Sequence, residues 1–187
     1  MTRRARATVK IDILVRSDRW QGTRAASAIV RRAVMRAATT LSTGPTELAI
    51  VLTDNSTIRA LNRDWRGIDT ATNVLSFPTR NSGGQHLGDI VLAYETIARE
   101  ARRERKPFAH HLAHLTVHGF LHLVGYDHED EQGALVMEDA ERAILRRLAI
   151  PDPYRARGRN NVGHPTPRPA KQDGRRGARV EIGRAHV

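Results

Sequence analysis

Residues 118–128 read HGFLHLVGYDH and contain three of the nine histidines in the chain. His118 and His122 are four positions apart, which places both imidazoles on one helical face, about 6 Å apart along the helix axis. Gly125 can take a left-handed conformation, end the helix and turn the chain back, which brings His128 towards the other two. Three imidazoles that converge in this way are typical ligands of a transition-metal ion. The spacing therefore predicts a metal centre at His118, His122 and His128.

The same spacing of three histidines and one glycine occurs in the signature of metzincin proteases. In that signature a glutamate follows the first histidine and serves as the general base, whereas Gly119 stands at this position here. Peptide hydrolysis by that mechanism is therefore disfavoured. Three protein ligands leave one position of a tetrahedral ion open, which is typical of a catalytic rather than a structural site. An ion in such a site acidifies a bound water and polarises a carbonyl or phosphoryl oxygen.

Other polar residues near the three histidines have less defined roles. His114 lies four positions before His118, but it is two helical turns from His122, about 12 Å along the axis, so one ion cannot take both without strain. We interpret His114 as a neighbour that packs beside the site or donates a hydrogen bond to it. His110 and His111 are interpreted as residues of the helix start. Three acidic residues are near enough in sequence to orient a ligand or assist proton transfer: Asp127, Glu129 and Asp130.

The composition limits the other classes of protein and of site. The 187 residues fit one compact domain and a tail, and hydrophobic residues make up 40% of them, enough for one core. No apolar run reaches the length of about 18 residues that a membrane-spanning helix needs. With no cysteine, a transition-metal site must use His, Asp or Glu. The polar N-terminal segment lacks the apolar core of a signal peptide, so we expect a cytoplasmic protein.

The formal net charge of the chain is +11. Residues 151–187 contain nine basic and three acidic residues and therefore carry +6 of it, which leaves +5 for residues 1–150. Such a balance suits a polyanionic partner such as RNA, because phosphates attract basic side chains. An Arg-rich genome composition explains the same charge equally well, so the charge alone does not assign a partner.

Hydrophobic periodicity divides residues 7–150 into strands and helices. Alternating apolar residues or short apolar runs predict strands at 7–15, 47–53, 72–77 and 87–93. Helical spacing of apolar residues predicts helices at 22–41, 54–64, 95–105, 108–124 and 131–148. Asp54 or Ser56 is expected to cap the second of these helices. His118 and His122 fall near the end of the helix predicted over 108–124.

The segment 151–187 differs from the rest of the chain. It contains five Pro and five Gly among many Arg and has few large apolar side chains, so it cannot bury enough surface to order itself. We interpret it as a disordered basic tail that follows a domain of residues 1–150. It is either a basic arm on RNA or a dispensable extension, and the second interpretation is favoured. The last seven residues, EIGRAHV, match a translated sequencing-adapter read-through and are a candidate artefact.

Further motifs accompany the histidine segment along the chain. They are Leu61-Asn62 to Arg66-Gly67, TNVLSFP at 72–78, LGDI at 87–90 and HGFLHLVGYDH at 118–128. With these motifs in this order, residues 8–150 resemble the YbeY family of endoribonucleases, also called rRNA maturation factors. The last motif is highly specific, and Gly119 is normal for that family. The tail after residue 150 lies outside the resemblance.

The resemblance implies a zincin-like α+β fold, with a mixed sheet of about four strands packed with helices and a central metal-binding helix. It implies one Zn²⁺ ion at the three histidines, although other divalent transition metals also suit three imidazoles. It further implies single-strand-specific RNA cleavage, maturation of the 16S rRNA 3′ end and ribosome quality control. The partners that it implies are rRNA precursors, the small ribosomal subunit, a ribosomal protein near the subunit platform and a ribosome-associated GTPase.

In that family the arginine of the Arg-Gly turn faces the metal cleft, and Arg66 stands at this position. A guanidinium can grip a phosphate with two parallel hydrogen bonds, so we expect Arg66 to be catalytic, although an arginine there can also bridge loop carbonyls. The nucleophile, a water or the neighbouring ribose 2′-OH, stays open. Two rival hypotheses remain: a ribosome-assembly factor whose metal is mainly structural, and a metallohydrolase of another substrate class. The sequence does not predict the oligomeric state.

Overall fold

The computed structural model describes residues 8–23, 25–79, 85–128 and 130–155. The disordered tail predicted to begin at residue 151 is wrong for residues 151–155, which contact the last helix. The rest of that tail lies outside the described residues. Its centre is a sheet of four strands: β1 (Val9–Val15), β2 (Thr46–Thr53), β3 (Val74–Pro78) and β4 (His86–Ala93). The strand order is β1-β2-β4-β3, in which β1, β2 and β4 run parallel and β3 pairs antiparallel with β4 at one edge. The prediction of a mixed four-stranded sheet in an α+β fold is therefore confirmed.

The described helices are η1 (Asp18–Trp20), α1 (Ala26–Leu41), α2 (Asn55–Arg66), α3 (Tyr94–Arg103), α4 (Phe108–Leu123) and α5 (Glu131–Arg146). α1 begins at Ala26 rather than at residue 22, because a turn follows η1. Asp54 caps α2 by accepting the Thr57 N–H at 3.0 Å. α2 runs to Arg66, past the predicted end, and stops where Gly67 turns left-handed with φ of 71°. None of these helices combines the length and hydropathy needed to cross a membrane.

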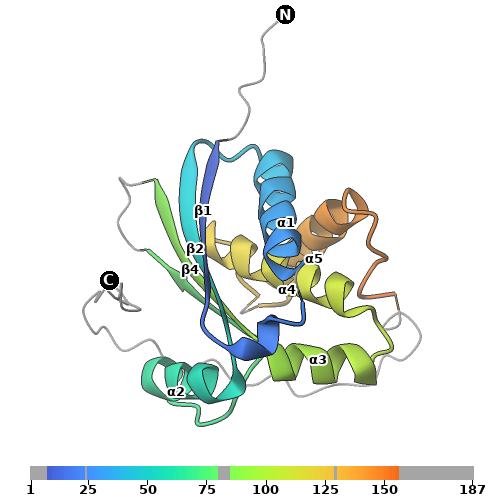
Figure 1. Ribbon diagram of the computed structural model, residues 1–187. Coiled ribbons are helices and arrows are strands. Elements are labelled where there is room, and N and C mark those ends of the chain that lie inside the picture. The colour runs from blue at the N-terminus through green and yellow to red at the C-terminus, as the bar shows by residue number, and fades with distance from the viewer. Residues whose placement is uncertain (1–7, 24, 80–84, 129, 156–187) are drawn as a thin grey trace, which may run out of the picture.

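The side chains of the sheet form two apolar layers, one on each face. On the first face, residues of β2 and β4 pack with α1, α4 and α5: Leu48, Ile50, Leu52, Ile90 and Leu92. On the second face, the residues of β2 and β4 that alternate with these pack with Ile58 of α2, and Leu75 of β3 joins them. The residues of this layer are Val51, Leu75, Val91 and Ala93. Figure 1 shows α1, α4 and α5 together on one side of the sheet and α2 apart from them. This division follows from the two-residue period of a strand, and it places the histidine helix in the larger layer.

Gly119 lies where α4 packs against β3 and β4. A Cβ atom at this position would lie 3.0 Å from Ile90 Cγ2 and 3.1 Å from Ser76 Oγ. The Ser76 hydroxyl also donates a hydrogen bond to the Gly119 carbonyl at 3.2 Å. An added methyl group at such distances would force these two side chains to shift by a few tenths of an ångström, so glycine allows the helix to lie close to the sheet. The residue that departs from the protease signature therefore has a packing reason.

A polar network joins α3, α4 and the start of β3. The carboxylate of Glu100 accepts hydrogen bonds from His111 Nε2 and Asn73 Nδ2, each at 2.9 Å. Asn73 Oδ1 accepts the Val74 N–H at 2.7 Å. His111, interpreted from the sequence only as a helix-start residue, is 5% exposed and connects α4 to α3.

This network predicts a loss of stability in acid. Burial by itself raises the pKa of Glu100, but the hydrogen bonds from His111 and Asn73 outweigh it and hold the pKa below its ordinary value of 4.5. A carboxyl whose pKa falls on folding stabilises the fold above its unfolded-state pKa, and this contribution is lost as the pH falls through the folded-state value.

Urea unfolding of wild type and Glu100→Gln checks this expectation. The variant should be less stable than wild type near neutral pH, and the difference in unfolding free energy should shrink as the pH falls below about 4.5. A difference that stays constant with pH would show that the ionised carboxylate contributes nothing.

Candidate metal centre

α4 carries two of the predicted ligands, and the loop after it carries the third. His118 Nε2 and His122 Nε2 lie 3.2 Å apart. One ring nitrogen from each of His118, His122 and His128 lies within 4.8 Å of the others. The ring centroid of His128 is 5.6 Å from that of His118 and 5.0 Å from that of His122. The structure thus brings together the three histidines that the spacing selected.

The end of α4 turns the chain through the predicted left-handed glycine. Gly125 has φ of 94°, and its N–H donates to the His122 carbonyl at 3.2 Å. The Tyr126 N–H donates to the Leu121 carbonyl at 3.0 Å. This pair of bonds is the Schellman arrangement that ends a helix. Because a side chain would be strained at that φ, glycine is what allows His128 to return towards α4.

The Nδ1 atoms of His118 and His122 contact groups that can only accept hydrogen bonds. His118 Nδ1 donates to Glu141 Oε1 at 2.7 Å, and His122 Nδ1 donates to the Tyr126 carbonyl at 3.1 Å. A neutral imidazole with its proton on Nδ1 carries a lone pair on Nε2. The two Nε2 atoms that face each other across 3.2 Å are then both electron-pair donors. A cation between them removes their repulsion.

These positions suit a divalent transition-metal ion. Two nitrogens bound at 2.0–2.1 Å to a tetrahedral ion lie about 3.3 Å apart, close to the 3.2 Å between the Nε2 atoms of His118 and His122. Burial, together with the electrostatic repulsion that a protonated His122 would meet from the rings of His118 and His128, lowers the pKa of His122 to about 4. Its ring is therefore neutral near neutral pH, which is the form that binds metal. His128 is exposed, so the centre is open to solvent on its side.

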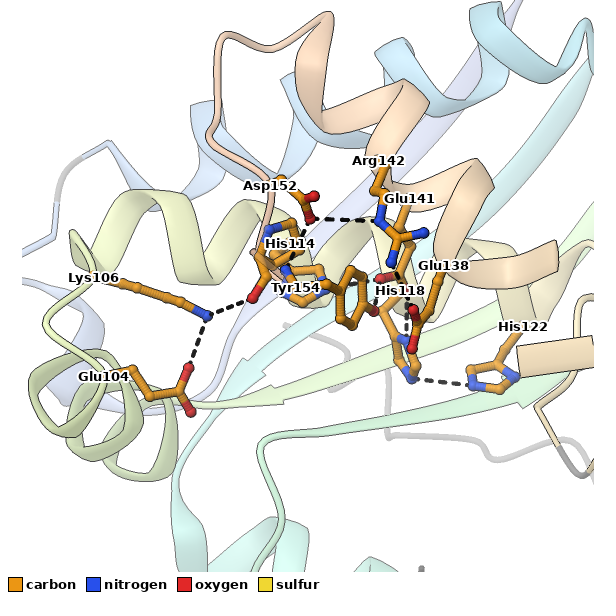
Figure 2. Close-up of polar contacts among 11 residues, drawn as sticks. Glu104, Lys106, His114, His118, His122, Glu138, Glu141, Arg142, Asp152 and Tyr154 are labelled. Atoms are coloured by element: carbon orange, nitrogen blue, oxygen red, sulfur yellow. Dashed lines mark hydrogen bonds and ion pairs between the residues drawn. The ribbon is translucent and has the colours of Figure 1, made fainter. Parts of the chain in front are cut away.

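The carboxylate behind these histidines comes from α5. Glu141 is fully buried, and it accepts hydrogen bonds from His118 Nδ1 at 2.7 Å, from His114 Nε2 at 2.9 Å and from the Tyr154 hydroxyl (Figure 2). Burial by itself raises the pKa of this carboxyl, but the bonds from His114 and His118 hold it well below its ordinary value. A carboxylate in this position fixes the tautomer of a metal-binding imidazole and increases its basicity.

Sequence reasoning missed Glu141, although a signal for it exists. The residue shares the buried face of α5 with Met137, Ile144 and Leu145. A carboxylate at a helical position that the pattern reserves for apolar side chains must find partners, because an unpaired buried charge is costly. His114 is one of these partners, and hydrogen-bond donation was one of the two roles that the spacing left open for it.

The acidic residues closer to the ligands have other partners. Asp127 Oδ1 accepts the His128 N–H at 2.6 Å, so it contacts the backbone of the third histidine. Asp130 caps α5 by accepting the Gly133 N–H at 2.6 Å. Glu129 lies outside the described residues. Among the described residues, the carboxylate that hydrogen-bonds to a ligand ring is Glu141, which is more distant in sequence.

Arg66 is exposed at the last position of α2. Among the residues that the structure describes, no hydrogen bond or ion pair joins its side chain to the three histidines. The neighbouring Trp65 ring packs against Phe77 of β3, with centroids 5.7 Å apart. The catalytic role expected for Arg66 stays a prediction.

Comparison with known proteins finds related sequences over most of the chain. The sequence model of the family described as Endoribonuclease YbeY matches residues 14–149. A relative from Rhodopseudomonas palustris (strain BisB5), named Endoribonuclease YbeY, is 53% identical over 156 residues, which cover 76% of this chain and 80% of the relative. A relative of the same name from Nitrobacter hamburgensis is 54% identical over 153 residues and covers the same shares of the two chains.

A solved structure shares the fold. The solution structure of TM1509 from Thermotoga maritima matches with a TM-score of 0.51 and 23% sequence identity, over 74% of this chain and 91% of that one. The range matched by the family model contains the positions of Arg66 and of the three histidines. Because it spans most of the chain and the relatives are more than 50% identical, this chain belongs to the endoribonuclease YbeY family.

Proposed function

We propose that this protein is a metal-dependent endoribonuclease that cleaves single-stranded RNA. Its role would be the processing of rRNA precursors in the cytoplasm, with maturation of the 16S rRNA 3′ end and ribosome quality control. The observation that carries the proposal is the pair of Nε2 atoms that face each other across 3.2 Å at His118 and His122, beside the exposed His128. The relatives named Endoribonuclease YbeY support the choice of RNA as substrate.

The proposed cofactor is one Zn²⁺ ion per chain, held by His118, His122 and His128. Three imidazoles and an open position are a ligand set that catalytic zinc takes in hydrolases. A divalent ion at this centre would polarise the phosphoryl group and acidify a water. Glu141 supports such an ion from behind, because it keeps the proton of His118 on Nδ1 and leaves Nε2 as an electron-pair donor.

Arg66 is proposed to grip the scissile phosphate and to neutralise the charge that develops on its oxygens. Support comes from the edge strand that lies between α2 and α4. Phe77 of β3 packs against Trp65, the neighbour of Arg66, and Ser76, next to Phe77, bonds to the Gly119 carbonyl of α4. The end of α2 and the histidine helix thus contact adjacent residues of one short edge strand, from opposite faces of the sheet.

The proposed partners are rRNA precursors, the small ribosomal subunit, a ribosomal protein near its platform and a ribosome-associated GTPase. The net charge of +11 favours a polyanionic surface of this kind. The metal centre itself requires only that a single strand of RNA reach the exposed side at His128.

An RNA-cleavage assay tests the proposal. Zinc-loaded protein is incubated with a single-stranded fragment of an rRNA precursor and with the same fragment annealed to its complement. We expect cleavage of the single strand, little cleavage of the duplex, loss of activity on chelation and recovery on addition of Zn²⁺. Cleavage that persists after chelation would contradict metal dependence, and activity on casein instead of RNA would favour a metallohydrolase of another class.

The products of the same assay identify the nucleophile. A 2′,3′-cyclic phosphate end would exclude water as the first nucleophile and assign attack to the neighbouring ribose 2′-OH. A free 3′-hydroxyl with a 5′-phosphate would assign attack to water.

A further inference from the structure

The chain returns to the metal centre after its last helix. Residues 151–155, here called the C-terminal strap, follow α5 and contact it again (Figure 2). The Tyr154 hydroxyl of the strap donates a hydrogen bond to Glu141 Oε2. The other oxygen of this carboxylate accepts the bond from His118 Nδ1 at 2.7 Å. A single carboxylate thus connects the strap to one of the three histidines.

Contacts from two segments hold the strap in place. Arg142 Nε lies 3.6 Å from Asp152 Oδ1, and its guanidinium carbon lies 5.0 Å from the centroid of the Tyr154 ring. Asp152 Oδ1 accepts the Tyr154 N–H at 2.9 Å. Lys106, just before α4, donates to the Pro153 carbonyl at 3.5 Å. These contacts position the tyrosine ring independently of its bond to Glu141.

The Tyr154 hydroxyl contributes to the hydrogen bonding of a buried charge. Glu141 is fully buried, and its Oε2 atom accepts bonds from both His114 Nε2 and the Tyr154 hydroxyl. Removing a donor from a buried carboxylate leaves a lone pair without a partner and weakens the restraint on the group. Any rotation of the carboxylate moves Oε1 away from His118 Nδ1, which loosens the orientation of that ring.

We propose that Tyr154 is a positioning residue of the metal centre, which keeps His118 oriented through Glu141 and thereby increases the affinity for the divalent ion. The inference rests on the proposed metal site but not on the proposed RNA substrate. Groups that bond to metal ligands change metal affinity about 10- to 100-fold. Because Tyr154 contacts Glu141 rather than the histidine itself, we expect a change in metal affinity at the lower end of this range, about tenfold.

The Tyr154→Phe variant tests the proposal, because it removes the hydroxyl and keeps the ring beside Arg142 and His114. The dissociation constant for Zn²⁺ is measured by competition with a chromophoric chelator. The visible spectrum of the Co²⁺-loaded protein reports the geometry of the ligands. We expect Zn²⁺ to bind about tenfold more weakly than in wild type and the Co²⁺ spectrum to change.

Tyr94→Phe is the matched control. Its ring lies 5.3 Å from Trp20 and 5.4 Å from Phe108 between centroids. Phe108 begins α4, about 15 Å along the helix axis from His118. This variant makes the same chemical change elsewhere in the fold. It should leave both the Zn²⁺ affinity and the Co²⁺ spectrum as in wild type.

Each outcome separates the inference from the proposed function. Equal Zn²⁺ affinity in wild type and Tyr154→Phe would overturn the positioning role and leave the proposed nuclease intact. An equal weakening in Tyr94→Phe would assign the effect to a general loss of stability and would also overturn it. A wild-type protein that binds neither Zn²⁺ nor Co²⁺ would overturn both the inference and the metal-dependent function.

Discussion

A His122→Ala variant is expected to lose its divalent ion and to cleave RNA at least about a thousand times more slowly than wild type. In the wild type the Nε2 atom of His122 lies 3.2 Å from His118 Nε2, so the substitution removes one of these two donor atoms. A metal ion contributes several kcal/mol to transition-state charge stabilisation. About 4 kcal/mol corresponds to a thousand-fold change in rate.

Metal content and initial cleavage rate measure this effect directly. Elemental analysis of purified wild type and variant gives the ion per chain, and a single-stranded rRNA-precursor fragment serves as the substrate. His110→Ala is the matched control, because it makes the same substitution in the first turn of α4, outside the group of three histidines. The control should retain both metal and activity. A His122→Ala protein with wild-type metal content would contradict the ligand assignment.

The same variant separates an enzyme from a ribosome-assembly factor with a mainly structural metal. One observation favours a structural metal: Glu141 joins His118 of α4 to α5 inside the core. If the metal is mainly structural, His122→Ala should lose cooperative thermal unfolding together with the ion. If the protein is the proposed nuclease, the far-ultraviolet circular dichroism and a cooperative transition should persist while cleavage disappears.

An Arg66→Ala variant is expected to keep its metal and its fold but to cleave RNA about 100 to 1,000 times more slowly. The reason is that one donor aimed at developing transition-state charge typically contributes this much to a rate. Arg66→Lys should recover only part of the loss, because an ammonium group cannot make two parallel hydrogen bonds to a phosphate. The exposed position of Arg66 at the end of α2 predicts little change in melting temperature.

Single-turnover cleavage rates with saturating protein separate catalysis from RNA binding. Arg63→Ala is the control, because Arg63 lies in the same last turn of α2 and pairs with Asp64 at 3.0 Å. An unchanged rate in Arg66→Ala would rule out the catalytic role. An equal loss in both variants would instead indicate that this end of α2 attracts RNA through its charge alone.

Several elements of the fold followed from local patterns. The strands predicted at 47–53 and 87–93 agree with β2 and β4 to within one residue, because apolar runs with turn signals on both sides are strong strand indicators. The helix predicted at 108–124 agrees equally well with α4. The four-stranded mixed sheet was implied by the family resemblance rather than by periodicity. Strand order depends on contacts between segments that are far apart in the chain.

The spacing of the histidines alone determined that three imidazoles meet, because two of them are one turn apart on a helix and Gly125 sets the direction of the chain that carries the third. Only the tertiary structure decided what holds these imidazoles in place. Glu141 and Tyr154 reach His118 because α5 and the C-terminal strap pack against α4. Such neighbours depend on how whole helices pack together, which residue spacing within one segment does not encode.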